Sequence, residues 1–135
     1  MTFSDFFDRI GNLDWLAVLV GALIFMVIGW LWYGPLFGKQ WAKMTGTTAG
    51  SMAPDKLIWT FVYSFVLSGA VNYFGVLDDV EHALVTAILL GVLLISAAAY
   101  SLVVWENRKP GLWLIDLLYI FMSIAVVTYV QGLMA

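Results

Sequence analysis

The sequence predicts an all-α, polytopic membrane protein, with four transmembrane helices and short amphipathic helices at the membrane surface. Of its 135 residues, 63% are hydrophobic and only 11% are charged, which is more apolar surface than a water-soluble domain of this size could bury. The apolar residues gather in runs of roughly the 20 residues that a hydrocarbon core about 30 Å thick requires. These runs are residues 15–33, 57–77, 83–105 and 112–133, within a single domain.

The first 14 residues predict a short amphipathic helix on the outer membrane surface. Their apolar side chains recur near helical spacing, at Phe3, Phe6, Phe7, Ile10 and Leu13. The alternative is a frayed terminus, which is common at chain ends. A cleavable signal peptide does not fit, because Asp5 and Asp8 precede the apolar run and no small-residue cleavage site follows it. We therefore expect the first span to be retained.

The connection between the first two spans contains two kinds of sequence. Pro35 removes a backbone donor and is expected to end the first helix. An amphipathic segment then follows, with Phe37, Trp41 and Met44 on one side and Lys39 and Lys43 on another. We expect it to lie on the anionic inner surface of the membrane as an anchor. Residues 46–55 are small, polar and glycine-rich, which predicts a flexible link that runs into the first turn of the second span at Pro54.

Positive charge is concentrated in alternate connections. Five of the six cations, Lys39, Lys43, Lys56, Arg108 and Lys109, fall between spans one and two or between spans three and four. Only Arg9 falls on the other side. The positive-inside rule then places both of these connections in the cytoplasm and both termini outside, in a single orientation.

Tryptophans are distributed unevenly between the two membrane surfaces. Trp30, Trp32, Trp41, Trp59, Trp105 and Trp113 map to the inner side, and Trp15 alone maps to the outer side. Indoles favour the headgroup region, where one edge is wet and the body is apolar. We therefore interpret the inner group as an interfacial belt, with an aromatic ligand-binding site as the alternative.

Two stretches of this sequence resemble a known family. They are GWLWYGPLFGKQWAKMTG, residues 29–46, and WENRKPGLWLID, residues 105–116. Together they resemble an uncharacterised bacterial membrane family, domain of unknown function 1761, over nearly the whole chain. The resemblance implies a four-span protein in the bacterial inner (plasma) membrane, and it implies no activity. The sequence departs from the family pattern at Asp116, where an asparagine often stands.

Asp116 is the one acidic or basic residue inside a predicted span. A charged side chain at the bilayer centre costs about 2.5 to 3.5 kcal/mol on insertion scales, so this group must face protein or water, or become neutral. Its helix face continues through Tyr119 and Ser123. The second span carries a matching polar stripe, four residues apart, at Thr60, Ser64, Ser68 and Asn72. We expect the two stripes to meet.

The two stripes allow two interpretations. In the first they are packing contacts, with hydroxyls, an amide and a carboxyl hydrogen-bonded between helices. In the second they line a polar path or a binding cavity, in which Asp116 contacts an ion or carries a proton. The inner mouth of such a path would be shaped by an inner-face cluster of Lys39, Trp41, Trp105, Glu106, Arg108 and Lys109.

Close helix packing is predicted separately by small residues spaced four apart. The pairs are Ala17 and Gly21, Ala87 and Gly91, and Ala97 and Ser101. Small side chains allow two helix backbones to approach each other.

Several classes of function are excluded by composition. The chain has no cysteine, so disulfides and thiolate chemistry are absent. Its one histidine lies in DDVEH, residues 78–82, where Asp78 and Glu81 are better interpreted as a helix cap than as metal ligands. No nucleophile elbow or phosphate-binding loop occurs, and the basic residues are too few for nucleic acid. We therefore expect no enzyme activity, metal or cofactor.

Two functional hypotheses remain. The first is a homo-oligomeric transporter or channel for an ion or small solute, in which water or ions reach Asp116. The second is a non-catalytic scaffold or accessory subunit of a membrane complex, in which Asp116 is dry and a protein partner is bound. Both place the protein in contact with the lipid bilayer.

Overall fold

A computed structural model describes residues 1–46 and 54–135, and that part of the chain is all-α, as the sequence predicts. The predicted flexible link falls mostly within residues 47–53, which lie outside the described part. The elements are α1 (Phe3–Gly11), α2 (Trp15–Leu31), the π-helix η1 (Trp32–Leu36), α3 (Gly38–Thr45), α4 (Pro54–Phe74), α5 (Val80–Thr86), the π-helix η2 (Ala87–Ser96), α6 (Ala97–Trp105) and α7 (Pro110–Met134).

Four helical stretches are long and apolar enough to cross a membrane: Trp15–Leu36, Pro54–Phe74, Val80–Trp105 and Pro110–Met134. Their ends differ from the sequence expectation by a few residues, for local reasons. Pro54 and Pro110 open their helices in the first turn, where the missing N–H is not needed. Gly75 ends the second stretch with a φ of 92°, a conformation that favours glycine.

Pro35 does not end the first spanning helix, contrary to expectation. It lies inside η1, where the backbone widens to a π-turn and the N–H of Phe37 donates to the carbonyl of Trp32 at 2.8 Å. A π-turn accommodates the missing proline donor within a continuous helix. The chain direction changes only after Leu36, where α3 begins.

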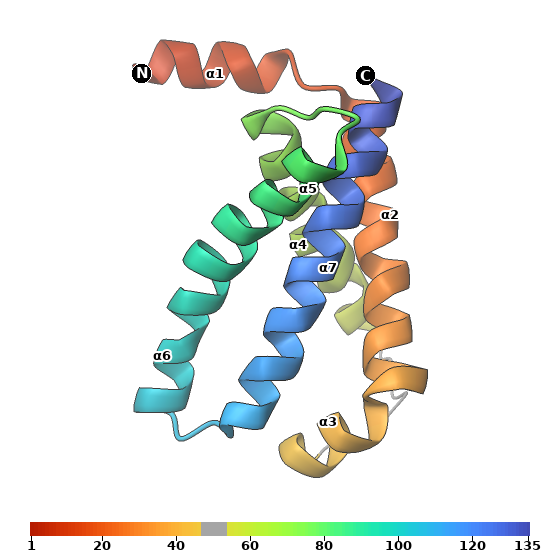
Figure 1. Ribbon diagram of the computed structural model, residues 1–135, viewed down its shortest axis with the longest axis vertical. Helices are drawn as coiled ribbons and strands as arrows, with labels where there is room; N and C mark the ends of the chain where they lie inside the picture. The colour runs from red at the N-terminus through yellow and green to blue at the C-terminus, as the bar shows by residue number, and fades with distance from the viewer. Residues whose placement is uncertain (47–53) are drawn as a thin grey trace.

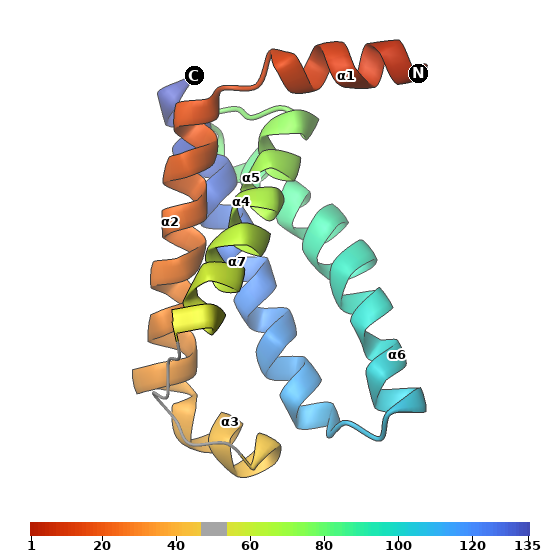
Figure 2. The same ribbon diagram turned by 180° about the vertical axis from the view of Figure 1, so that it is seen from behind.

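α7 is the central helix of the bundle (Figures 1 and 2), and it contacts α2, α4, α5, η2, α6 and α3. α2 and α4 pack against each other and against α7, while α5, η2 and α6 form one continuous helix along another side of α7. Both termini and the connection after α4 lie at one end of the bundle, here called the terminal end. α3 and the connection between α6 and α7 lie at the opposite end, here called the α3 end.

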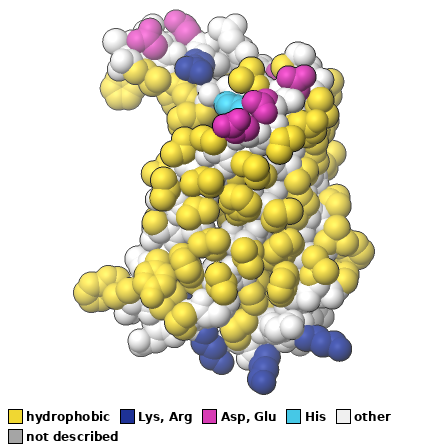
Figure 3. Space-filling model, in the orientation of Figure 1, with side chains coloured by type: hydrophobic (Ala, Val, Ile, Leu, Met, Phe, Trp, Pro, Cys, Tyr) yellow, Lys and Arg dark blue, Asp and Glu magenta, His cyan; other side chains and the backbone are white. Residues whose placement is uncertain are grey.

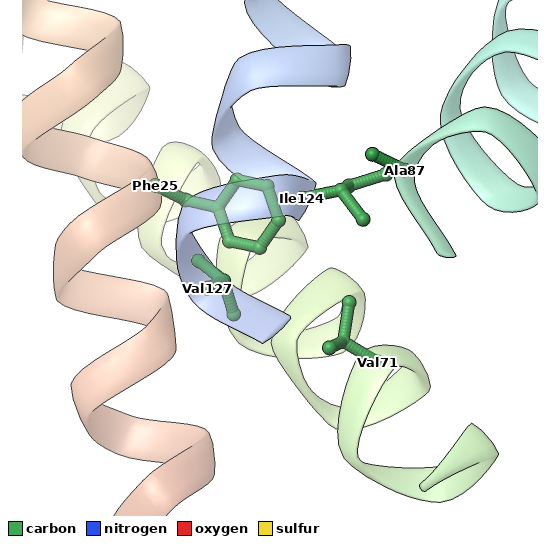
Figure 4. Close-up of a cluster of buried hydrophobic side chains, with 5 residues drawn as sticks. All are labelled: Phe25, Val71, Ala87, Ile124 and Val127. Atoms are coloured by element: carbon green, nitrogen blue, oxygen red, sulfur yellow. The ribbon is translucent and has the colours of Figure 1, made fainter. Parts of the chain in front are cut away.

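The apolar core lies where these helices meet. Its buried cluster consists of Phe25, Val71, Ala87, Ile124 and Val127. Figure 4 shows Phe25 pointing from α2 toward α7, and Ile124 pointing from α7 toward Ala87. Most other large apolar side chains are exposed and form a broad apolar band between the two charged ends (Figure 3). This distribution fits a bundle surrounded by lipid.

α1 is an ordered helix that lies across the terminal end of the bundle (Figure 1). A capping box fixes its start, because the Thr2 N–H donates to Asp5 Oδ2 at 2.8 Å and the Asp5 N–H donates to Thr2 Oγ1 at 3.2 Å. The first of these bonds holds the pKa of the Asp5 carboxyl below its usual range. Arg9 stacks 4.9 Å from the ring centroid of Tyr73 on α4, which joins α1 to the bundle.

Glycine permits the closest helix contacts in the bundle. A side chain at position 21 would collide with Ser68 Oγ, with Gln131 Nε2 at 2.7 Å and with Val127 Cγ1 at 2.9 Å. The predicted pairs at Ala17 and Gly21 and at Ala87 and Gly91 are buried in such contacts. The pair at Ala97 and Ser101 is exposed, so it does not pack two helices within one copy of the chain.

We expect Gly21→Ala to destabilise the bundle by about 1 to 3 kcal/mol, the usual cost of overpacking. Gly69→Ala is the matched control, because a Cβ there would meet only Val18 Cγ1 at an ordinary 3.9 Å. Thermal unfolding in detergent should show a lower Tm for the first variant and an equal or higher Tm for the second. Equal Tm values for the two variants would contradict the close three-helix contact at Gly21.

Candidate functional site

The interior polar side chains form two groups at different depths. The first, the acid layer, consists of Tyr33, Asp116 and Tyr119 and lies toward the α3 end. The second, the amide layer, consists of Ser68, Asn72 and Gln131 and lies toward the terminal end. The predicted stripe of α4 is joined to α7 through Gln131, and Asp116 is bonded by Tyr33; the sequence analysis included neither Gln131 nor Tyr33.

Gln131 is the centre of the amide layer and is fully buried. Its Nε2 donates to the Ala17 carbonyl at 3.0 Å and to Ser68 Oγ at 2.8 Å. Ser68 Oγ in turn donates to the Val18 carbonyl at 2.7 Å. Side chains of α4 and α7 therefore bind backbone carbonyls of α2, at the level where Gly21 lets the three helices approach.

Asn72 extends the amide layer to the surface of the terminal end. Its Nδ2 donates to Gln131 Oε1 at 3.3 Å, and its Oδ1 accepts from the backbone N–H of Asp14 at 3.1 Å. Asp14 is also the N-cap of α2, because its carboxylate accepts from the N–H of Ala17 at 3.1 Å. This layer consequently ends where the first span begins.

The acid layer is built by the π-turn η1 and by α7. Tyr33 Oη donates to Asp116 Oδ1 at 2.5 Å, and Trp32 Nε1 donates to the Ile115 carbonyl at 3.1 Å. Tyr119 Oη donates to the Phe25 carbonyl at 2.9 Å. The π-turn thus presents two successive aromatic residues to the start of α7, which fixes the hydroxyl of Tyr33 on the carboxyl group.

Aromatic rings enclose one side of the acid layer. The Tyr33 ring packs edge-on against Tyr119, with centroids 5.3 Å apart, and against Trp41 of α3, with centroids 5.9 Å apart. α3 therefore contributes to the same site as η1 and α7.

The Asp116 carboxyl is only partly enclosed. The residue is partly exposed, and within residues 1–46 and 54–135 no group donates a hydrogen bond to its Oδ2. Arg108 interacts with the carboxyl electrostatically, but it lies too far away for an ion pair. Asp116 is the sixth residue after Pro110, hence roughly 9 Å along α7 at about 1.5 Å per residue. One carboxylate oxygen is therefore available for a further contact.

Between the two layers lie two buried hydroxyls without partners. Ser64 and Ser123 are fully buried, and neither Oγ is hydrogen-bonded to a described residue. Ser123 lies one helical turn beyond Tyr119 on α7, and Ser64 lies one turn before Ser68 on α4. Buried polar groups are nearly always hydrogen-bonded, so these two are exceptions.

Thr60, the first member of the predicted α4 stripe, does not join the site. Its hydroxyl donates to the Lys56 carbonyl of its own helix at 2.6 Å. This local bond is common for threonine in helices. The polar stripe of α4 effectively begins at Ser64.

The predicted inner-face cluster is at the α3 end but is not a single site. Trp105 is 83% exposed, and Lys39, Glu106, Arg108 and Lys109 are also exposed, without an ion pair in the part of the chain that the structure describes. Only Trp41 contacts the acid layer directly. On the face drawn in Figure 3, Lys and Arg side chains lie at this end, and acidic side chains with one further cation lie at the terminal end.

The tryptophans divide between lipid-facing and interior positions. Trp30 and Trp59 are 60% and 67% exposed, as expected of a membrane-interface belt. Trp32 and Trp113 instead use their indole N–H groups between helices, the latter donating to the Ser96 carbonyl at 2.7 Å. Trp32 and Trp113 therefore make packing contacts that the belt interpretation did not predict.

The cap at the start of α5 is Asp79, not Asp78. Its carboxylate accepts from the Glu81 N–H at 3.0 Å, while His82 Nε2 lies 3.2 Å from the Gly75 carbonyl. In the described residues no three His, Cys, Asp or Glu side chains are grouped to hold a metal ion.

Comparison with known proteins finds one family. A family model described as "Protein of unknown function (DUF1761)" matches residues 16–132. No curated protein matches, and no solved structure matches.

We expect Gln131→Leu to lower the free energy of unfolding by roughly 2 kcal/mol, because it removes several hydrogen bonds worth about 0.6 to 2 kcal/mol each inside a membrane bundle. Thr60→Val is the control, since its hydroxyl binds only its own helix, and its stability should be unchanged. Unfolding in mixed micelles with increasing denaturing detergent measures both. A Gln131→Leu variant as stable as the native protein would show that the amide layer does not hold the helices together.

Proposed function

Because the chain belongs to the DUF1761 family of proteins of unknown function, we propose its function from the site itself: it is a homo-oligomeric transporter or channel for an ion or small solute. Asp116 is the group that contacts the transported species. The observation that carries this proposal is a partly exposed carboxyl at membrane depth with one oxygen unbonded.

The energetics of the bilayer support this assignment. A charged side chain facing hydrocarbon is costly, and intramembrane acids accordingly face a protein interior or water. Tyr33 satisfies only Oδ1 of Asp116. Oδ2 therefore needs a partner that one copy of the chain does not supply from its described residues, and water or an ion in a path would be that partner.

A second copy of the chain accounts for the rest of the path. The core of one bundle is closed around Phe25 and Ile124, so a path wide enough for a solute would run beside α7 and not through it. In a homo-oligomer, a neighbouring subunit would cover the open side of Asp116 and exclude lipid from it.

We also propose a bacterial inner (plasma) membrane location with both termini outside. Five cations lie at or next to the α3 end, against one at the terminal end, and the positive-inside rule places the cationic end in the cytoplasm. The acid layer would then open toward the cytoplasm.

A non-catalytic scaffold or accessory subunit is the second candidate. It is favoured by the amide layer, whose hydrogen bonds are made within the bundle, and by an apolar surface groove that no member of the acid layer lines. The groove residues are Val20, Leu23, Ile24, Val27, Ile28 and Val126. Under either candidate we propose that the protein is not an enzyme and uses no cofactor.

Ion and proton flux into proteoliposomes tests the transport proposal. We expect the native protein to conduct above empty liposomes, and Asp116→Leu to abolish conduction while keeping its Tm, because the aliphatic side chain cannot contact an ion. Asp116→Asn keeps the shape of the side chain and removes its charge, so it separates the effect of the charge on conduction from the effect of the side-chain shape. A native protein that conducts nothing and co-purifies with a stable partner from native membrane would favour the scaffold.

Single-cysteine labelling tests the orientation, because the native chain has no cysteine. In cells with a permeabilised outer membrane, an impermeant maleimide should label Asp78→Cys at the terminal end. Glu106→Cys at the α3 end should react only after lysis. Ser4→Cys on α1 serves as a second probe of the terminal end, and the opposite labelling pattern would contradict the proposed topology.

A further inference from the structure

We infer that the acid layer binds an organic cation, a protonated amine that donates an N–H to Asp116 and whose apolar part contacts Tyr33 and Trp41. This inference rests on the proposed transport function, whose substrate class it names. The observation behind it is one open carboxylate oxygen beside aromatic rings that are themselves partly exposed.

Two contacts join the carboxyl group to the aromatic rings. Tyr33 Oη donates to Asp116 Oδ1 at 2.5 Å, which holds the Tyr33 side chain on the carboxyl group. The same ring lies 5.9 Å from the ring of Trp41, centroid to centroid. Carboxyl, phenol and indole therefore follow one another from α7 through η1 to α3. A ligand with its charge at one end can contact all three.

The aromatic part of this site is accessible. Asp116, Tyr33 and Trp41 are each partly exposed, whereas Tyr119 is buried. The Tyr33 ring meets the rings of Trp41 and Tyr119 at interplanar angles of 65° and 64°, so the three rings do not stack face to face. They form an aromatic corner, of which Tyr33 and Trp41 are the parts that a ligand can reach.

The chemistry of these groups selects an organic cation over an anion or a metal ion. No described Lys or Arg forms an ion pair with Asp116, so the carboxylate is left to attract a positive ligand and to repel a negative one. A dehydrated Ca²⁺ or Mg²⁺ ion takes about six or more oxygen ligands, but within residues 1–46 and 54–135 no three acidic or His side chains are grouped. Aromatic faces, in contrast, attract ammonium ions.

The open oxygen of Asp116 favours an amine that carries an N–H. Tyr33 satisfies Oδ1, and Oδ2 lacks a donor among the described residues. A hydrogen bond between an ammonium N–H and a carboxylate is roughly twice as strong as one between neutral groups. A quaternary ammonium ion has the same charge but no N–H, so it loses this bond. The site should therefore prefer a primary amine to its quaternary analogue.

The surroundings of Asp116 favour an amine with an apolar substituent. The carboxyl lies roughly 9 Å along α7 from Pro110, at about 1.5 Å per residue, and so inside the spanning helix. The indole of Trp32, bonded to the Ile115 carbonyl, and the ring of Phe37, 5.1 Å from it, extend the aromatic surface of η1. An aromatic or alkyl group on the amine is transferred out of water there, which favours binding.

Binding of phenethylammonium to the native protein in phosphatidylcholine nanodiscs tests the site. Isothermal titration calorimetry, with empty nanodiscs as background, should show saturable binding. We expect Asp116→Asn to weaken it by about tenfold or more, because a charged hydrogen bond is lost. Trp41→Leu should weaken it roughly threefold to tenfold, the effect of one cation–π contact at a partly exposed site, and Trp41→Phe should restore most of it.

Trp105→Leu is the matched control for Trp41→Leu. Its indole is 83% exposed at the same end of the bundle and makes no ring contact with a described member of the acid layer. The affinity of this variant for phenethylammonium should equal that of the native protein.

A quaternary analogue separates the hydrogen bond from the charge. N,N,N-Trimethylphenethylammonium should bind the native protein about fivefold more weakly than the primary amine. The difference should disappear in Asp116→Asn, because Tyr33 holds the amide oxygen and the NH2 group then faces the ligand. The comparison in the native protein needs no variant, so it decides the inference even if Trp41→Leu lowers the Tm.

An ammonium group is also present in the lipid phosphatidylethanolamine. Adding this lipid to the nanodiscs leaves the affinity for phenethylammonium unchanged if the natural ligand is a free amine. It lowers the affinity if the lipid headgroup competes for Asp116. Either result is consistent with an ammonium site, and the two results distinguish the sources.

The outcomes separate the inference from the proposed function. Native affinity in Asp116→Asn overturns the inference, as do equal losses in Trp41→Leu and Trp105→Leu, or tighter binding of the quaternary analogue. Uptake of radiolabelled phenethylammonium into proteoliposomes separates binding from transport. Binding without uptake supports the site and contradicts transport of the amine. Conduction of sodium ions or protons without amine binding overturns the inference and leaves the transport function standing.

Discussion

The close approach of α2, α4 and α7 at Gly21 is the contact on which the rest of the bundle depends. A membrane removes the hydrophobic drive between helices, so small residues and interhelical hydrogen bonds must hold them together. A small residue and interhelical hydrogen bonds occur together here, because the missing side chain of Gly21 leaves room for Ser68 and Gln131 to reach carbonyls of α2. The positions of α4 and α7 on α2 follow from that contact, and with them the depth of every other polar group.

The acid layer differs from the Gly21 contact in its hydrogen bonding and exposure. The hydrogen bonds of the amide layer are made within the bundle, as expected of packing contacts, whereas Asp116 keeps one carboxylate oxygen unbonded and its residue partly exposed. Two neighbouring features explain how such a group is tolerated. The π-turn at Pro35 places Tyr33 on the carboxyl, and the short distance to the α3 end leaves it within the influence of Arg108.

The sequence predicted the four helices that are long and apolar enough to span a membrane, because the length of an apolar run is the same before and after folding. It did not predict Gln131, although one more step of eight residues from Ser123 along the same face of α7 reaches it. The hydrogen bond from Tyr33 to Asp116 could not be predicted, because the direction of the Tyr33 side chain depends on a π-turn for which the sequence has no clear signal. The prediction that Thr60 joins the site was wrong because its hydroxyl donates to the backbone of its own helix. The cap of α5 is Asp79 and not the predicted Asp78, a difference of one residue at a helix boundary.

The two ends of the bundle differ in their charged residues and in how they are closed. At the α3 end, exposed cations and tryptophans fix the depth of the membrane surface and leave Asp116 roughly two turns below it. At the terminal end, α1 lies across the bundle and the amide layer closes the space beneath it. Access from the α3 end therefore meets a carboxyl with an open oxygen, while access from the terminal end meets a sealed hydrogen-bonded layer. Between these two ends the bundle interior is closed by the apolar core around Phe25 and Ile124, with the hydroxyls of Ser64 and Ser123 buried beside it.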